Sequence, residues 1–405
     1  MSGRGSPARM RRRLAEYLAA IAMPFLFLPP LAAGAVLARV WRRLRPERRG
    51  RQLRLLWAGA PLRSLKTASD ALRDAGYVSR TIASARYRTV PDGVFDAVVE
   101  LPVRLWPGLN ALAYTSRAAG FFLRSMFDSD VLHCFFNGGI LGRTALARWE
   151  WRLWKLSGGR LILFPYGSDA FVYRSLPDTE WARALVATYP RTADEDLRVE
   201  HRIAHGCRVA DAVVGCIVHD VSLPRVDRHP LLWYPFDSAL KPNYTEPGPV
   251  LRVAHAANHP AIKGTAALRE AVRKLRDEGI AIDLEIVEGQ DHPAALEAFA
   301  RADIVVDQLL FGYALAALEA MALGKPVITG LGDDPLYDGY RARGQLDDTP
   351  LIAAGPGSIV DVLRRIALEP QALPEQARRS RAYVEHRHGP LQTVALFEDL
   401  YAITG

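Results

Sequence analysis

Residues 303–330 have the sequence DIVVDQLLFGYALAALEAMALGKPVITG and carry the clearest structural signal in the chain. Apolar residues up to Leu310 predict a strand, a Phe-Gly-Tyr loop follows, and small residues from about Ala314 predict a helix. Gly312 lets the backbone approach a ligand closely, and the free N–H groups at the start of the helix suit a diphosphate. Glu319 lies in the second turn among apolar neighbours, so its carboxylate needs a hydrogen-bonding partner, for which a ribose diol is suitable.

The alternation of strands and helices continues on both sides of this segment. Short apolar runs alternate with amphipathic helices over residues 53–236, where ADAVVGCIV (210–218) predicts one of the strands, and again over residues 250–388. Such alternation predicts parallel βαβ units, so we expect an α/β fold of two Rossmann-like, doubly wound domains that face each other across a cleft. Residues 237–249 contain three prolines and no apolar periodicity, which predicts the linker, and residues 389–405 predict a helix that could pack back on the first domain.

Within residues 303–330, LEAMALGKPV (318–327) resembles the C-terminal signature of glycosyltransferase family 4, whose members are retaining enzymes of the GT-B fold. In that family the second glutamate of the signature binds the nucleotide ribose, and the resemblance gives this role to Glu319. The first glutamate of the signature falls on Phe311, where this chain departs from the family pattern. The resemblance is collinear from about residue 53 to residue 405 and is most specific in the second half.

A second motif, IKGTAALREA (262–271), resembles the Lys-Gly-x-x-x-Leu segment of the family and implies that Lys263 contacts the donor diphosphate. A compact ammonium neutralises the charge that develops on a leaving phosphate. The family usually has an arginine a few residues earlier, where this chain has HAANHP, so His255, Asn258 or His259 replaces it or nothing does. The donor site implied by the resemblance consists of Asn258, Lys263, Glu288, Gly289, Phe311, Gly312, Tyr313, Ala314 and Glu319.

In the first domain, LFPYGSDAF (163–171) resembles the His-Gly-x-Asp stretch of the family, with Tyr166 at the histidine position. The resemblance implies that Tyr166 and Asp169 act in catalysis together with Lys263, while the alternative for Asp169 is that it simply caps a helix. The acceptor side of the cleft is expected to include Gly59, His133, Asn137, Gly167 and Ser168.

Two of these first-domain positions have competing interpretations. DVLH (130–133) resembles a strand of the family that ends in histidine, and His133 is either a catalytic group or a histidine of the core. The sequence NGG at residues 137–139 is either a phosphate-binding loop or an ordinary turn.

A basic and apolar segment precedes the first domain. Residues 17–38 are 22 uncharged residues, which as a straight helix would span roughly 33 Å, about the thickness of the hydrocarbon core of a bilayer. Pro24, Pro29 and Pro30 interrupt the run, and arginines flank it on both sides. Three interpretations stay open: a kinked single span, a shallow hairpin bent at the proline pair, and a secretory signal peptide. A buried core helix fits poorly because arginines crowd both ends.

The net charge of +8 is concentrated in this segment. Residues 1–54 carry thirteen arginines and two glutamates, which give +11, so the remaining chain carries about −3. This distribution argues against a nucleic-acid surface spread over a domain. The three cysteines are not spaced as a zinc site or a redox pair and favour a reducing compartment. The sequence DSD at residues 128–130 imitates a metal-binding Asp-x-Asp but precedes its strand, so we expect no metal ion.

These expectations combine into one function. We expect a membrane-associated glycosyltransferase that is attached through residues 1–52, with its catalytic domains on the cytoplasmic side of the cytoplasmic membrane. It would transfer a sugar, with retention, from a nucleotide-sugar co-substrate to a lipid-linked or cell-envelope glycan acceptor, and it would need no other cofactor. Two alternatives stay open: a nucleotide-sugar epimerase of the same fold, which needs no anchor, and a catalytically inactive scaffold of a polysaccharide assembly complex.

Overall fold

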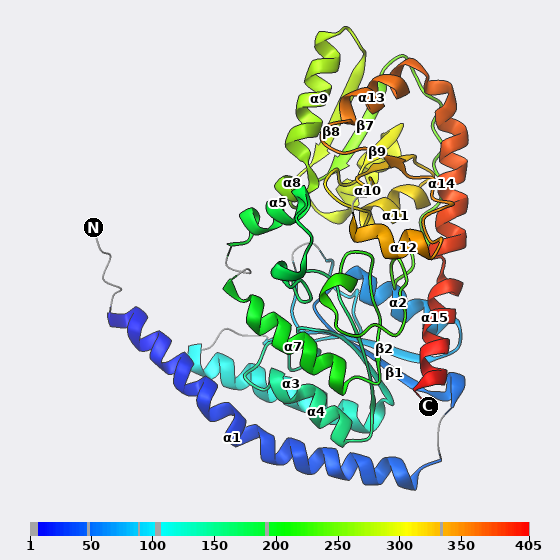
Figure 1. Cartoon of the computed structure of the whole chain (residues 1–405). Helices are drawn as coiled ribbons and strands as arrows, with labels where there is room; N and C mark the ends of the chain where they lie inside the picture. The colour runs from blue at the N-terminus through cyan, green and yellow to red at the C-terminus, as the bar shows by residue number, and fades with distance from the viewer. Residues whose placement is uncertain are drawn as a thin grey trace.

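The computed structural model describes residues 7–46, 49–87, 90–101, 107–190, 194–332 and 335–404. It has two α/β domains, each built around one parallel sheet, with the second domain above the first in Figure 1. The expectation of two doubly wound domains is confirmed by this arrangement.

The sheet of the first domain has six parallel strands in the order β3-β2-β1-β4-β5-β6. The strands are β1 (Arg54–Gly59), β2 (Val78–Ala83), β3 (Ala97–Val98), β4 (Val131–Phe135), β5 (Arg160–Phe164) and β6 (Ala212–Val213). The central strands are buried on both faces, which explains why their sequences are continuous apolar runs instead of alternating ones.

Helices cover both faces of this sheet. Alternate residues of β1 belong to two different core clusters: Leu55 and Trp57 pack on one face, and Leu56 and Ala58 pack on the other. The first face is covered by α2 (Arg63–Asp74) and α15 (Pro390–Ile403). The second face is covered by α3 (Pro107–Asp128), α4 (Ala147–Leu156) and α7 (Asp196–Val209).

The sheet of the second domain has five parallel strands in the order β11-β10-β9-β7-β8. The strands are β7 (Leu251–Ala256), β8 (Ile282–Val287), β9 (Ile304–Val306), β10 (Val327–Thr329) and β11 (Ile352–Ala353). The helices are α8 (Pro260–Lys263), α9 (Thr265–Asp277), α10 (His292–Arg301), α11 (Leu315–Ala322), α12 (Asp338–Ala342), α13 (Ile359–Leu368) and α14 (Leu373–His388). Helices α9 and α13 pack together on one face, and α11 packs against α14 on the other.

Helix α15 joins the two domains, because it follows α14 of the second domain and packs on α2 of the first (Figure 1). The Tyr401 hydroxyl lies 3.0 Å from His133 Nε2, and Asp399 forms an ion pair with Arg228. Near the linker, the Phe236 N–H donates to the carbonyl of His388. The two places where the chain passes from one domain to the other therefore lie side by side.

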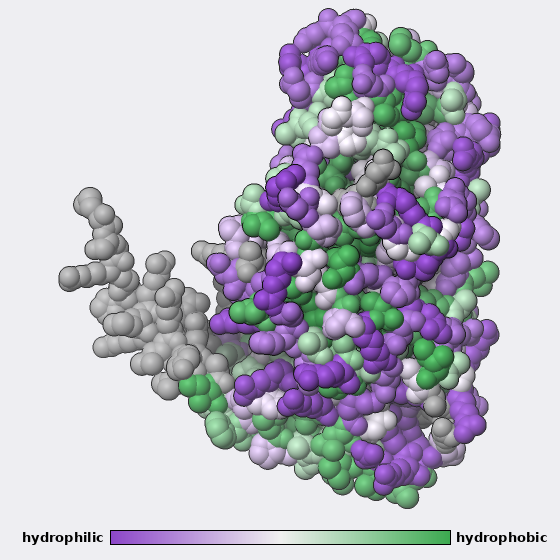
Figure 2. Space-filling view, viewed as in Figure 1, coloured by the Kyte–Doolittle hydropathy of each residue, from purple (hydrophilic) through white to green (hydrophobic). Residues whose placement is uncertain are grey.

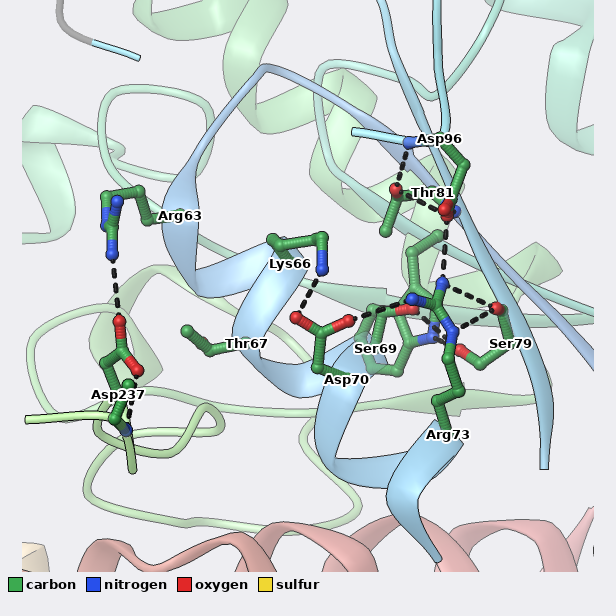
Figure 3. A network of polar contacts seen from close by, with 12 residues as sticks. Arg63, Lys66, Thr67, Ser69, Asp70, Arg73, Ser79, Thr81, Asp96 and Asp237 are labelled. Atoms are coloured by element: carbon green, nitrogen blue, oxygen red, sulfur yellow. Dashed lines mark hydrogen bonds and ion pairs between the residues drawn. The ribbon is translucent and has the colours of Figure 1, made fainter. Parts of the chain in front are cut away.

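The contacts of α2 fix the edge of the first sheet (Figure 3). Arg73 forms an ion pair with Asp96 at 3.0 Å, and Asp96 also accepts a 2.7 Å hydrogen bond from the N–H of Thr81. At the other end of the helix, Arg63 forms a 3.1 Å ion pair with Asp237, the first residue of the expected linker. Helix α2 is therefore tied both to its own sheet and to the domain junction.

Helix α1 (Pro7–Leu44) is one continuous helix through Pro24, Pro29 and Pro30, and it lies against α3 and α4 (Figure 1). Its inner face is buried at Leu31, Ala35 and Ala38. The predicted hairpin at the proline pair is therefore wrong. Both prolines lie on the exposed side of the helix, where the ring and the backbone groups that it leaves unbonded meet no neighbouring element.

The end of α1 is also fixed to the first domain by charge. Arg42 and Arg45 form ion pairs with Asp130, and an Arg42 guanidinium nitrogen donates to the carbonyl of Met126 at 2.8 Å. Two arginines of the basic flank thus face inward. Asp130, one of the aspartates of the DSD sequence, therefore has both arginines as ion-pair partners.

The opposite face of α1 is apolar and exposed, and we call it the outer face. It consists of Ile21, Phe25, Leu26, Val36, Leu37, Val40, Trp41 and Leu44. Figure 2 shows apolar residues along the edge of the molecule where α1 runs. Residues 21–44 have a mean hydropathy of 2.0 over their most apolar window and are long enough to cross a membrane. Because the inner face packs on the first domain, the arginine-flanked run is a domain-bound helix with a second, unpartnered apolar side.

Candidate functional site

The most organised polar cluster in the second domain lies where β9 ends. Asp307 follows the strand and is 1% exposed. Its Oδ1 accepts from Lys263 Nζ at 3.0 Å, and its Oδ2 accepts from the Ala314 N–H at 3.1 Å, at the start of α11. The Lys263 ammonium also donates to the Ala256 carbonyl at 3.0 Å. One buried carboxylate therefore fixes the predicted phosphate-binding lysine beside the predicted phosphate-binding helix.

Asp307 was not among the predicted site residues. Its one sequence signal is its position directly after the apolar run IVV, at the carboxyl end of a parallel strand, where ligands bind in this class of fold. Gly264 supports the same geometry, because it has a φ of +76° and a Cβ there would lie 2.9 Å from the Leu309 Cβ. A side chain at that position would push α8 away from the loop after β9.

The start of α11 keeps part of its expected donor capacity. The Ala314 N–H is used by Asp307, whereas the N–H groups of Leu315 and Ala316 have no acceptor within the described parts of the chain. The Gly312 N–H donates to the Tyr337 hydroxyl, and the Gly312 carbonyl accepts from Thr329 Oγ1 at 2.6 Å. These two N–H groups lie at the positive end of the helix dipole, beside the Lys263–Asp307 ion pair, and they can donate to an anion.

Glu319 is buried in α11, and its Oε1 lies 2.7 Å from Nε2 of His292, the first residue of α10. The structure thus gives this carboxylate a partner inside the protein, which the sequence did not indicate. The histidine side chain is 16% exposed, so the pair lies just under the surface of the same domain. A ribose diol would have to meet this pair from its exposed side.

The remaining predicted donor residues lie in different environments. Glu288 and Gly289 follow β8 at the surface, where Glu288 forms a 3.3 Å ion pair with Arg269. Asn258 is exposed in the turn before α8. Among the candidates for the missing arginine, His255 is fully buried between the Val306 carbonyl and the Thr265 hydroxyl.

The prediction that the Tyr313 side chain binds the donor is corrected by the structure. It is buried, and its hydroxyl lies 3.0 Å from His388 Nε2 and 3.4 Å from the Tyr383 hydroxyl. Burial raises the pKa of Tyr313 well above its usual value. Only the backbone of this residue remains for contact with a ligand, because its ring points into the core beside α14.

Residues of the second domain also contact the first domain across the cleft. Phe311 stacks at a tilt on Trp181 of α5 (Glu180–Thr188), with the ring centroids 4.8 Å apart. The Tyr340 hydroxyl donates to Asp220 Oδ2 at 2.8 Å. His259 lies against Tyr189, which follows α5. The two domains are thus in direct contact through these three pairs, in addition to the junction formed by α14 and α15.

The predicted catalytic Asp169 has a structural role in this arrangement. It is 2% exposed and accepts hydrogen bonds from the N–H groups of Phe136, Tyr166 and Gly167 at 2.9–3.1 Å. Burial raises the pKa of Asp169 to about 7, while these hydrogen bonds lower it. The carboxylate therefore caps two loops and does not face the cleft, which corrects its assignment to catalysis.

Tyr166 and Asn137 lie at the mouth of the first domain. The Asn137 side-chain amide donates to the Tyr166 hydroxyl at 2.8 Å, and both residues are half-buried. Burial raises the pKa of Tyr166, so the hydroxyl stays protonated and can still donate. Gly167 and the exposed Ser168 follow in the same loop. These are the predicted cleft residues that remain accessible to an acceptor.

His133 needs a correction as a cleft residue. It is fully buried, stacks on Trp57 at 4.0 Å, and bonds the Leu56 carbonyl through Nδ1 and the Tyr401 hydroxyl through Nε2. Burial lowers the pKa of His133 to about 3. Gly59 is buried as well, and a Cβ there would lie 2.7 Å from the Phe135 ring, so it allows strand packing instead of ligand contact.

The NGG loop after β4 is organised by an acid of the protein itself. Glu150 of α4 is fully buried and accepts from the N–H groups of Gly139 at 2.8 Å and Leu141 at 2.9 Å. Burial raises the pKa of Glu150 to about 7. The interpretation as a phosphate loop is therefore wrong, because the donors that a phosphate would use already bind this carboxylate.

The described residues contain no group of three or more His, Cys, Asp or Glu side chains that could hold a metal ion.

No protein-family model matches the sequence, and no curated protein matches it. Solved structures do resemble the fold. Anabaena HepE in complex with UDP-glucose is 11% identical, covers 86% of this chain and 99% of its own, and gives a TM-score of 0.52. A glycosyltransferase from Rickettsia africae is also 11% identical, covers 87% of this chain and 98% of its own, and gives a TM-score of 0.50. With this likeness and its two facing parallel-sheet domains, the protein has the GT-B fold.

Proposed function

We propose that the protein is a glycosyltransferase that uses a nucleotide-sugar donor. The observation that carries the proposal is the triad of Lys263, Asp307 and the start of α11, which lies at the carboxyl ends of β7 and β9 in the second domain. A buried acid that fixes an ammonium beside unpaired backbone donors is suited to a diphosphate. The Anabaena protein of the same fold was solved with UDP-glucose, which supports this class of ligand.

The proposed roles follow from this geometry. Lys263 and the N–H groups of Leu315 and Ala316 bind the diphosphate and stabilise it as it leaves. Glu319, held by His292, is the candidate for the ribose. Retention of configuration follows the family 4 resemblance, in which the acceptor hydroxyl attacks from the face of the leaving group, so the protein mainly orients the two substrates. No metal ion is required for this task.

The acceptor side belongs to the first domain. The accessible residues there are Asn137, Tyr166 and Ser168, and the Tyr166 hydroxyl remains protonated and can hydrogen-bond a sugar. We propose a lipid-linked or cell-envelope glycan as the acceptor. The exposed apolar outer face of α1 supports this proposal, because a helix with such a face would bring the first domain to a membrane surface.

Membrane association is proposed from charge and exposed apolar surface together. Phe25 is 80% exposed, Leu37 is 62% exposed, and Arg39 and Arg43 are exposed at the end of the same helix. An apolar stripe flanked by arginines is suited to an anionic bilayer surface. The basic segment suits the cytoplasmic face of the cytoplasmic membrane. Helix α1 would lie along the bilayer, because crossing it would separate the inner face from α3.

The test is binding and turnover with a panel of nucleotide sugars in the presence of membranes. We expect one nucleotide sugar to bind in calorimetry and its sugar to be transferred to a membrane lipid extract. Conversion of the sugar without any acceptor would instead favour the epimerase. Binding of none of the nucleotide sugars by the folded wild type would favour the inactive scaffold and contradict the proposal.

A further inference from the structure

A cavity of about 630 Å³ lies in the first domain beside α1, away from the proposed donor site. Its walls come from α1, from the first turns of α3, and from the segments that follow β2, β3 and β4. The lining residues that matter here are Met23, Ser84, Ala111, Tyr114 and Arg143. Segments at the carboxyl ends of parallel strands thus meet the membrane-facing helix at one place.

One cation in this cavity, Arg143, forms no ion pair with a described residue. Arg86 lines the wall but forms ion pairs with Asp92 and with Glu100, which also lines the cavity. Arg143 is exposed and has no hydrogen-bond or ion-pair partner in the part of the chain that the structure describes. Tyr114 donates its hydroxyl proton to the Ser84 carbonyl, which leaves its oxygen free to accept. The cavity therefore offers an anion a guanidinium that pairs with no described carboxylate, while Asp92 and Glu100 are both held by Arg86.

The loop that carries Arg143 also packs against the backbone of Asn137. The chain turns back on itself after β4, so that a Cβ on Gly142 would lie 2.7 Å from the backbone carbonyl oxygen of Asn137. The side chain of Asn137 in turn donates to Tyr166. An anion held by Arg143 would thus have its attached group close to the residues that we assign to the acceptor side.

The other end of the cavity leads to the outer face of α1. Met23 is buried in the wall, while Phe25 and Leu26, one helical turn away from it or less, are 80% and 58% exposed. A ligand that enters beside Met23 can therefore keep an apolar chain along the outer face while its polar head reaches Arg143. An apolar helix face that leads to a cavity with an arginine fits an amphipathic lipid with an anionic head group.

We propose that this cavity binds the phosphate of a lipid-linked acceptor, with Arg143 as the phosphate ligand and the lipid chain along α1. The inference rests on the proposed glycosyltransferase function and identifies the acceptor as a phosphate-bearing lipid. Arginine suits this role because its planar group binds two phosphate oxygens at once. The sugar attached to the phosphate would then point toward Asn137 and Tyr166.

The experiment compares full-length wild type with Arg143→Ala and Ala111→Phe on vesicles. One set of vesicles is phosphatidylcholine with a small fraction of polyprenyl phosphate, and the other carries the same charge as phosphatidylglycerol. We expect Arg143→Ala to weaken binding to the polyprenyl phosphate vesicles about tenfold, since a charged hydrogen bond is lost. Ala111→Phe, which narrows the cavity, should do the same. Binding to phosphatidylglycerol vesicles should not change.

Arg148→Ala is the matched control, because Arg148 is an exposed arginine of α4 that stacks on Trp149 and does not line the cavity. If Arg143→Ala and Arg148→Ala weaken vesicle binding equally, the binding depends on general surface charge, and the proposal is overturned. Displacement of the protein by millimolar inorganic phosphate would make the ligand a soluble phosphate and would overturn it too. Nucleotide-sugar binding by each variant, measured in parallel, reports folding and tests the proposed function separately from the cavity.

Discussion

Asp307→Asn is the most direct test of the donor site, because this one carboxylate holds both Lys263 and the start of α11. The asparagine keeps the size of the side chain and one acceptor oxygen but loses the charge. Asp307 is 1% exposed and the Lys263 side chain 12%, so water screens the ion pair little. Removing one partner of a buried pair costs about 3–5 kcal/mol. The retained oxygen and the Ala256 carbonyl offset about 1 kcal/mol, so we expect a loss of about 2–4 kcal/mol in unfolding free energy.

The assay is urea unfolding of the wild type, Asp307→Asn, Lys263→Met and the double variant, together with calorimetry of the bound nucleotide sugar. The two single changes should be coupled by about 1–3 kcal/mol, and donor affinity should fall about tenfold in Asp307→Asn. Asp303→Asn is the matched control, since Asp303 is equally buried and pairs with Arg252 at the opposite end of β9. A coupling near zero, or the same loss of donor affinity in Asp303→Asn, would refute the reasoning.

Three further outcomes are expected. Glu319→Ala should lower donor affinity about tenfold in calorimetry while the circular dichroism spectrum stays that of the wild type, and unchanged affinity would remove Glu319 from the site. The double change Phe25→Glu and Leu37→Glu should abolish sedimentation with anionic vesicles, whereas Leu368→Glu, at an exposed leucine of the second domain, should not. Burial raises the pKa of Glu150 to about 7 from 4.5, so its contribution to stability is present below pH 4.5 and is lost as the pH rises through 7. The fall in unfolding free energy between these pH values should be smaller in Glu150→Gln, and equal pH profiles would contradict the assignment.

The sequence predicted the domain architecture because parallel strands covered on both faces must be apolar throughout. The runs that became β1 and β4 are buried along nearly their whole length. The same reasoning overestimated β6, since ADAVVGCIV predicts nine strand residues and only Ala212–Val213 pair with β5. Beyond Val213 the N–H groups of Gly215 and Ile217 donate to the carbonyls of Arg228 and Leu231. A later segment of the chain thus replaces the sheet as the partner, and local periodicity cannot show this.

The sequence was less informative about side-chain direction in the site. Glu319 was placed in the correct helix, whereas the short helix α8 that ends at Lys263 was not predicted. Their partners Asp307 and His292 come from segments far along the chain, so the sequence did not indicate the pairing. His133 was expected at a strand end, but it lies in the middle of β4, and the return of α15 to the first domain seals it in the core. Such contacts between residues far apart in sequence decide whether a polar residue at a strand end faces a ligand or a neighbouring helix.

The buried face of helix α1 could not be predicted for a similar reason, and its packing affects how the protein can be truncated. Apolar residues on both sides of the helix conceal its periodicity, so the inner face could not be distinguished from the outer face before α3 was placed. A Cβ on Gly34 would lie only 2.2 Å from the Leu123 side chain, which shows how closely the two helices approach. Deleting residues 1–50 would uncover this surface of α3. We therefore expect the truncated protein to aggregate, and substitution of the outer face is the better way to separate membrane binding from folding.

The two departures from the family 4 pattern acquire physical meaning in the structure. Phe311, at a glutamate position of the signature, stacks on Trp181 of the first domain, and Tyr166, at a histidine position, accepts the Asn137 amide at the cleft. A glutamate at position 311 would place a charge against the apolar face of the Trp181 ring. The replacement by phenylalanine thus exchanges a polar sugar contact for an apolar contact between the domains. In the proposed glycosyltransferase the donor hydroxyls would then be bound by other groups, because the loop between β9 and α11 is part of the domain interface.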